Sequence, residues 1–168
     1  MKKLISIILI CLMIIAAFTG CGNSAPEPEH NTTVAIGNPW REWATIAEAE
    51  DAVGFTFGLP DVIAGNYKAA EFRTMNKELI EVVYLDGEYE VCVRKQVGEG
   101  EDISGDYNQY ESCTETQQNG AKITTYHNTQ NNAVKQLISY NGHSWSLVAE
   151  KGFSGDSAND FLNAILAQ

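Results

Sequence analysis

"LIEVVYLDGEYEVCVRKQV", residues 79–97, decides the fold because it reads as two strands joined by a tight turn. Apolar residues dominate its first half, and Asp86-Gly87 at its centre is a strong signal for a short hairpin loop. The second half alternates apolar residues with a polar row formed by Glu88, Glu90, Cys92 and Arg94. This alternation predicts an antiparallel sheet with one covered face and one wet face.

The same hairpin pattern recurs twice toward the C-terminus. Predicted strands 110–117 and 121–127 flank Asn119-Gly120, and predicted strands 134–140 and 143–149 flank Asn141-Gly142. Two earlier strands are expected at 55–59 and 67–75. Three hairpins in series favour an antiparallel sheet.

A helix is predicted at each end of these strands. Thr45 and Glu48 have the spacing of a capping box, ahead of an apolar stripe that ends at Gly54. Near the C-terminus, residues 157–160 are expected to cap a second stripe, 161–166. The sequence therefore predicts an α+β fold, with a curved antiparallel sheet of about six to eight strands built from successive hairpins and with both helices packed on one face. Trp145 and Leu147 are predicted to lie in the helix-covered core.

The N-terminus has the pattern of an export signal. Lys2 and Lys3 precede an apolar run, residues 4–18, which is followed by small residues and Cys21. The run is shorter than the roughly 20 residues that a membrane-spanning helix needs. Residues 18–21, Phe-Thr-Gly-Cys, resemble a bacterial lipobox, and this resemblance implies cleavage after residue 20 and acylation of Cys21. The alternative is a plain secretory signal with an incidental cysteine.

Three segments follow from this interpretation: a lipoprotein signal peptide, 1–20, a lipidated cysteine with a flexible tether, 21–37, and one α+β domain, 38–168. The tether is polar and contains Pro26, Pro28 and His30. Without Lys2 and Lys3, nine basic residues remain against 22 acidic ones, a net charge near −13. Such a charge excludes nucleic acid as a partner. We expect the acyl chains on Cys21 to hold the protein on the extracytoplasmic face of the cell membrane.

Several stretches of the predicted domain also resemble a known family. The stretches are "NPW" at 38–40, "EAEDAVGFTFGLP" at 48–60, "LIEVVYLDG" at 79–87, "CVRK" at 92–95 and "DISGDYNQY" at 102–110. Together they look like the domain of unknown function four-three-six-seven, found in exported lipoproteins and membrane-anchored proteins of Gram-positive bacteria. The resemblance covers roughly residues 38–166. It implies an envelope location, and it carries no catalytic motif.

Two cysteines remain in the predicted domain, Cys92 and Cys113. An even pair in an oxidising compartment favours a disulfide. Both lie on the polar face of consecutive predicted strands, so their side chains are expected to meet across the ladder. The alternative is two free thiols, because neighbouring strands also need the right register for disulfide geometry.

The loop 98–111 is rich in oxygen ligands. Glu99, Glu101, Asp102 and Asp106 have a spacing that can hold calcium, although the EF-hand pattern fails. A solvated acidic turn explains the loop better, in which case the protein needs no cofactor, and the calcium site is the alternative.

No catalytic motif is present in the sequence. Ser157 is better explained as a helix cap than as a nucleophile, and His127 and His143 lack a third metal ligand. Tyr84, Tyr126 and Tyr140 are candidates for a ligand-binding face, with ordinary sheet packing as the alternative. We therefore expect a non-catalytic binding or sensing module whose partner is a peptide, a lipid or an envelope protein. The alternatives are an envelope enzyme with an unrecognised site and a purely structural envelope protein.

Overall fold

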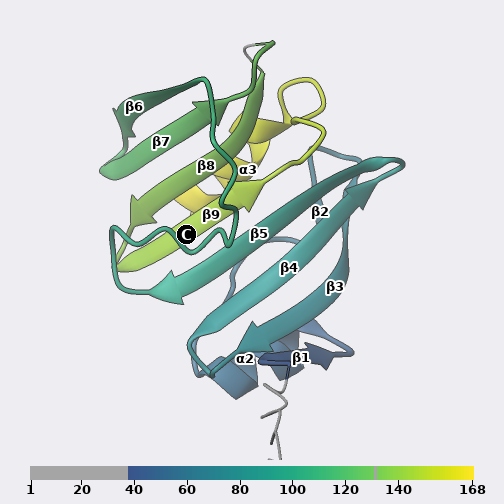
Figure 1. Ribbon diagram of the computed structural model, residues 1–168. Helices are drawn as coiled ribbons and strands as arrows, with labels where there is room; N and C mark the ends of the chain where they lie inside the picture. The colour runs from purple at the N-terminus through teal and green to yellow at the C-terminus, as the bar shows by residue number, and fades with distance from the viewer. Residues whose placement is uncertain (1–37, 131) are drawn as a thin grey trace, which may run out of the picture. The chain divides into compact units, whose positions relative to one another are not determined.

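One antiparallel sheet of nine strands organises the protein (Figure 1). The structure is a computed structural model that describes residues 38–130 and 132–168. The predicted signal peptide, Cys21 and the predicted tether lie outside the described residues. In chain order the elements are β1 (Trp40–Trp43), α2 (Ile46–Val53), β2 (Val62–Ile63), β3 (Tyr67–Met75), β4 (Leu79–Asp86), β5 (Tyr89–Val97), β6 (Ser112–Gln118), β7 (Ala121–His127), β8 (Ala133–Tyr140), β9 (His143–Val148) and α3 (Ser157–Leu166).

The three predicted hairpins are confirmed. Asn119-Gly120 and Asn141-Gly142 form two-residue turns with positive φ at both positions, as type I′ turns require. In the first hairpin Asp86 pairs with Tyr89, so the turn is Gly87-Glu88 and not Asp86-Gly87. The reason is that Gly87, with φ 59°, takes the first turn position, which needs a positive φ.

The order of the strands in the sheet is β1-β3-β4-β5-β9-β8-β7-β6, with β2 also paired to β3. The fifth strand therefore pairs with the last one, and residues 98–111 carry the chain from β5 past three strands to the far edge. We call this segment the strap. In Figure 1 the strap crosses in front of the sheet while α3 lies behind it. The sheet exceeds the expected six to eight strands because β1 and β2 are too short to give a periodic signal.

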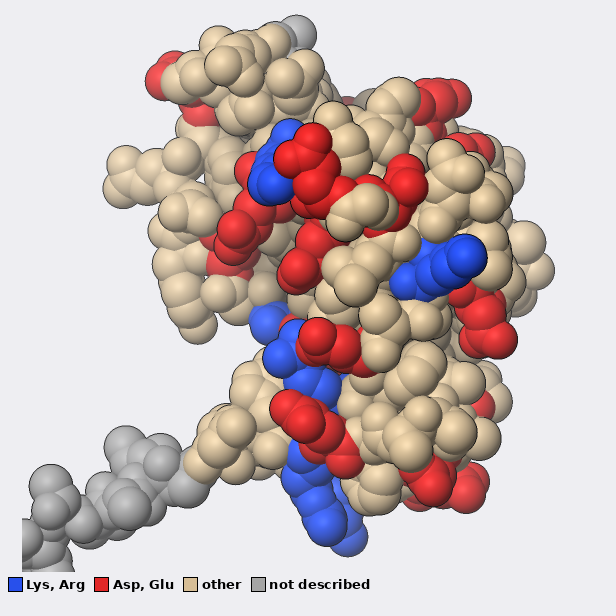
Figure 2. Space-filling view, turned by 90° about the vertical axis from the view of Figure 1, so that its right-hand side faces the viewer, with Lys and Arg blue, Asp and Glu red and all other residues tan. Residues whose placement is uncertain are grey.

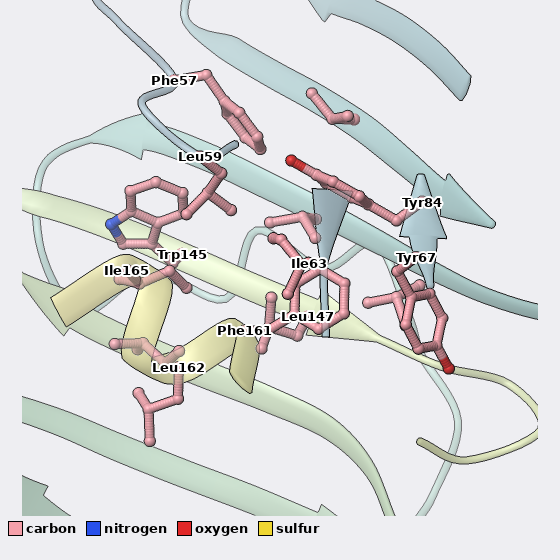
Figure 3. Close-up of a cluster of buried hydrophobic side chains, with 14 of the residues drawn as sticks. Phe57, Leu59, Ile63, Tyr67, Tyr84, Trp145, Leu147, Phe161, Leu162 and Ile165 are labelled. Atoms are coloured by element: carbon pink, nitrogen blue, oxygen red, sulfur yellow. The ribbon is translucent and has the colours of Figure 1, made fainter. Parts of the chain in front are cut away.

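We call the face of the sheet that the strap crosses the front face. The opposite face, on which α3 lies, carries the hydrophobic core (Figure 1). Phe161, Leu162 and Ile165 of α3 pack onto Trp145 and Leu147 of β9, so the prediction for these two strand residues is confirmed (Figure 3). Ala49 of α2 joins the same cluster, so both helices cover one face, as predicted. The core of large side chains comes from residues that are distant in sequence.

The two helices differ in how they begin. Thr45 accepts a hydrogen bond from the Glu48 amide at 3.3 Å, and Gly54 ends α2 with φ 82°, as predicted. By contrast, Ser157 is the first residue of α3 and its buried hydroxyl has no partner among the described residues. The predicted serine cap is therefore wrong, because Asp156 occupies the cap position.

The expected strand at 55–59 is also wrong. This segment is a loop, and Lys95 of β5 binds it to the sheet. The buried ammonium of Lys95 donates to the Thr56 carbonyl at 2.7 Å and lies 4.5 Å from the centre of the Trp145 ring. Burial lowers the pKa of Lys95, although the carboxylate of Glu50 acts in the opposite direction. Hydrogen bonds to carbonyl groups of the loop thus offset the cost of burying the charge of Lys95 on the core face.

Candidate ligand-binding cleft

Lys135 fastens the strap to the front face of the sheet. Its side chain is only 4% exposed, and its ammonium donates to Asp102 Oδ2 at 3.2 Å and to the Asp106 carbonyl at 3.3 Å. The ammonium also lies 4.6 Å from the Tyr126 ring centre and 5.4 Å from that of Tyr110. Carboxylate, carbonyl and ring contacts together offset the cost of burying the charge.

The two aspartates of the strap also hold the strap itself in shape. Asp102 Oδ1 accepts from the Ser104 amide at 3.0 Å and from its hydroxyl at 2.6 Å. Asp106 accepts from the Asn108 amide at 3.0 Å and from the Tyr110 hydroxyl. Burial alone would raise the pKa of both carboxyl groups, but these hydrogen bonds and Lys135 outweigh it and lower the pKa of each.

The hydrogen bond between Tyr110 and Asp106, which lowers the pKa of Asp106, raises the pKa of Tyr110. Burial, and then its hydrogen bond to the Asp106 carboxylate, raise the pKa of Tyr110 to about 12. The phenol therefore stays protonated near neutral pH and acts as a hydrogen-bond donor.

The two glutamates of the strap accept hydrogen bonds from donors outside the strap. Glu99 accepts from the Gly142 amide at 2.7 Å, and Glu101 accepts from the Gln96 side chain at 3.1 Å. Within residues 38–130 and 132–168, no three His, Cys, Asp or Glu side chains are placed to hold a metal ion. The four side chains of the alternative calcium site, Glu99, Glu101, Asp102 and Asp106, therefore do not converge on one point, since each accepts hydrogen bonds from protein donors.

A buried carboxylate stands beside the strap. Glu81 of β4 is 2% exposed, and its oxygens lie 2.7 Å from Arg73 Nε and 2.6 Å from Arg94 Nε. The N–H of Arg73 Nε does not point along a hydrogen bond, so its contact is an ion pair only. Trp40 stacks on both guanidinium groups at 5.8 and 5.1 Å. One buried carboxylate thus pairs with two arginines, and the exposed carboxylate of Glu71, 3.5 Å from Arg73 Nη2, balances the second positive charge.

Cys92 donates its thiol to the same glutamate at 3.0 Å. Burial raises the pKa of the Cys92 thiol, and the negative charge of Glu81 raises it further. The neutral thiol is therefore a poor nucleophile.

The predicted bridge between Cys92 and Cys113 is not present. Both are free cysteines, and the strands that carry them have β9, β8 and β7 between them. The two residues do share the front face and one row across the sheet. Four strand spacings put them about 19 Å apart along that row, far beyond the reach of a disulfide. The prediction assumes that strands consecutive in the chain are neighbours in the sheet. The strap instead carries the chain past β9, β8 and β7 before β6 begins.

A cleft of about 1090 Å³ lies between the strap and the front face of the sheet. Its walls include residues of β3, β4, β5, β8 and β9 and strap residues 104–108. Tyr107, one of the strap residues in the lining, is 95% exposed. The charged lining comprises five acidic side chains, Glu81, Glu88, Glu90, Asp106 and Glu150, and three basic ones, Arg73, Arg94 and Lys151. On the side of the protein seen in Figure 2, acidic side chains are likewise widespread and basic ones gather in a few places.

The three tyrosines predicted to form one ligand face do not share a face. Tyr84 is buried in the core, where its hydroxyl donates to the Pro60 carbonyl at 2.9 Å, and Tyr140 donates to the Leu166 carbonyl at 3.2 Å. Tyr126 lies on the front face beside Lys135. The predicted face is wrong because β-strand alternation sends these side chains to opposite sides.

The two histidines also lie apart. His127 ends β7, whereas His143 begins β9 at the opposite end of the ladder and contacts the Asn141 carbonyl at 2.8 Å. Their separation gives no paired histidine site.

Sequence reasoning missed Arg73, Glu81 and Tyr107 as cleft residues. One signal was available for Glu81, since it is the lone acidic residue within the otherwise apolar strand 79–85. A charge inside a two-sided apolar strand indicates a buried partner of opposite sign. No comparable signal exists for Tyr107, which is one exposed residue in a polar loop.

The cleft cannot be assigned by likeness to proteins whose ligands are known. Comparisons with protein families, curated proteins and solved structures found no match for this chain.

Proposed function

We propose that this chain is a lipid-anchored protein of the extracytoplasmic membrane surface, and that its domain is a non-catalytic binding module. The observation that carries the binding role is the cleft of about 1090 Å³ under the strap. Sites for small molecules and cofactors typically occupy about 300 to 1,000 Å³, so the cleft has room for a ligand. Its lining is rich in charged side chains, which suits a polar ligand.

The walls of the cleft are held in place by contacts within the protein. Lys135 and Arg94 bind the strap from two strands, the latter through the Ile103 carbonyl at 3.1 Å. A cleft that is formed in advance binds with a smaller loss of conformational entropy. This rigidity supports a role in recognition.

The membrane anchor is proposed from the sequence, on Cys21 and its lipobox-like surroundings. Several acyl chains on one cysteine give stable attachment, because each buried methylene contributes about 0.8 kcal/mol. In the part of the chain that the structure describes, no helix is long and apolar enough to cross a membrane.

Native mass spectrometry of the purified full-length protein tests the binding role. Val148 lines the cleft, so Val148→Trp is expected to fill it and to remove any molecule that co-purifies with the wild type. Val97→Trp is the matched control, because Val97 is 60% exposed and is not part of the cleft lining. A wild-type protein without any bound molecule, also after incubation with envelope extract, would contradict the proposal.

Metabolic labelling with an alkyne fatty acid tests the anchor. The wild type and Cys113→Ser are expected to carry the label, and Cys21→Ser is expected to lose it and to leave the membrane fraction. Equal labelling of all three proteins would show that the acylated site is elsewhere.

A further inference from the structure

Two arginines line the end of the cleft near the strap. Arg73 and Arg94 share the buried carboxylate of Glu81. Arg73 Nη2 also lies 3.5 Å from the exposed carboxylate of Glu71, which balances the second positive charge. Arg94 directs Nε to Glu81 and Nη1 to the Ile103 carbonyl, and Nη2 has no partner among the described residues. A guanidinium with free N–H groups is suited to a carboxylate.

The opposite end of the cleft is negative. The ladder between β5 and β9 ends at the pair Cys92 and Val148, and Glu90 and Glu150 lie two residues beyond it on each chain. Both line the cleft, and within the described residues neither forms an ion pair. Glu88 is balanced by Lys151 at 3.1 Å. Glu90 and Glu150 therefore present two unbalanced negative charges, which favour an ammonium group.

The distance between the two ends selects the size of the ligand. Glu90 and Arg94 are four residues apart on β5, which corresponds to about 13 Å along a strand. An extended peptide covers at most about 3.3 to 3.6 Å per residue, so about four residues match this distance. A single amino acid carries its two charges too close together to reach both ends.

The wall between the two ends suits the middle of such a ligand. Val134 and Val148 supply apolar surface, and Tyr107 displays its ring at the strap. Aromatic side chains of this kind anchor peptides at many interfaces.

We propose that the cleft binds a short extended peptide of about four residues, with its free carboxylate at Arg73 and Arg94 and its ammonium group at Glu90 and Glu150. This inference rests on the proposed binding function, because it names the ligand class of the same cleft.

Isothermal titration calorimetry of the full-length protein in mild detergent tests the proposal, with the free tetrapeptide Lys-Ala-Ala-Ala as the probe. The free peptide is expected to bind about tenfold or more tightly than its C-terminal amide, because amidation removes the charge that faces the arginines. Glu90→Gln is expected to weaken binding about two- to fivefold, and Glu90→Gln combined with Glu150→Gln about tenfold. Glu115→Gln is the matched control on the exposed strand β6 and is expected to leave binding unchanged.

Equal binding of the free and amidated peptides, or an equal loss in Glu115→Gln and Glu90→Gln, would overturn the proposal. If no peptide binds at millimolar concentration while native mass spectrometry finds a molecule that Val148→Trp excludes, the peptide proposal is wrong and the binding function stands. If neither experiment finds a ligand in the cleft, both are wrong.

Discussion

Glu81 is the residue on which the front face of the sheet depends. Its carboxylate is buried and contacts Arg73, Arg94 and the thiol of Cys92. A buried charge is costly unless opposite charges and hydrogen-bond donors surround it, and here both are present. The same contacts hold one wall of the cleft.

The two thiols of the domain are expected to differ sharply in reactivity. Cys113 is exposed on β6, whereas Cys92 is largely buried, with a pKa that burial and Glu81 raise. A maleimide reagent should therefore label Cys113 in the native protein, and Cys92 only after denaturation, as followed by mass spectrometry. Labelling of neither residue in denatured, unreduced protein would instead indicate a disulfide.

Gly105 is expected to resist substitution more than Gly100 of the same strap. Both have positive φ, 62° and 88°, where a Cβ costs about 1–2 kcal/mol. Only at Gly105 would the added Cβ collide with Arg94 Nη1. Gly105→Ala should therefore lower the free energy of unfolding, measured in urea, by about 1–2 kcal/mol more than Gly100→Ala does. Equal losses would show that Arg94 moves away freely.

At the scale of elements, the strap is expected to depend on Lys135. Lys135→Met keeps an apolar side chain between the two tyrosine rings but removes the cation that holds Asp102. We expect faster hydrogen exchange of strap amides and a loss of about 1–2 kcal/mol in the free energy of unfolding. Lys122→Met, at an exposed position of β7, is the control. Unchanged exchange in Lys135→Met would mean that the other contacts suffice.

Attachment of the strap should also depend on acidity. The pKa values of Asp102 and Asp106 are lowered in the folded protein, because hydrogen bonds and Lys135 outweigh burial. Their contribution is therefore complete above the ordinary aspartate pKa, about 3.9, and is lost as the pH falls through the lowered values. Strap amides followed by NMR are expected to lose protection in this acid range before the helix-covered core unfolds. In Asp102→Asn the pH dependence should be weaker.

For the molecule as a whole, stability should come from the helix-covered face. Phe161 of α3 is fully buried against Tyr67 and Tyr84, with ring centres at 5.4 and 5.2 Å. Phe161→Ala is expected to lower the free energy of unfolding by about 3–5 kcal/mol in urea titrations. Asn163→Ala, on the exposed side of the same helix, should change it by less than about 0.5 kcal/mol. Similar losses for both would indicate that α3 contributes little packing.

Much of the fold follows from local features of the sequence. The Asn-Gly turns join strands that are adjacent in the chain, and two-residue loops set the register of each hairpin. The capping box and Gly54 define α2 in the same local way. The position of Cys92 on the polar face of β5 could also be predicted, because side chains alternate between the two faces along a strand.

The candidate site could not be predicted to the same degree. The pairing of β5 with β9 decides that Cys92 and Cys113 lie far apart, that the strap crosses the front face and that Lys135 meets Asp102. Each of these contacts joins residues with no shared local pattern.

The sequence by itself determined the hairpins, their faces, the two helices and the acidic charge, because turn geometry, alternation and capping act over a few neighbouring residues. Only the tertiary structure decided which hairpin lies beside which, and with that the cleft and the charged groups at its two ends. The physical reason is that pairing between distant strands depends on the burial of the whole sheet face, to which helix α3 and the strap contribute from other parts of the chain.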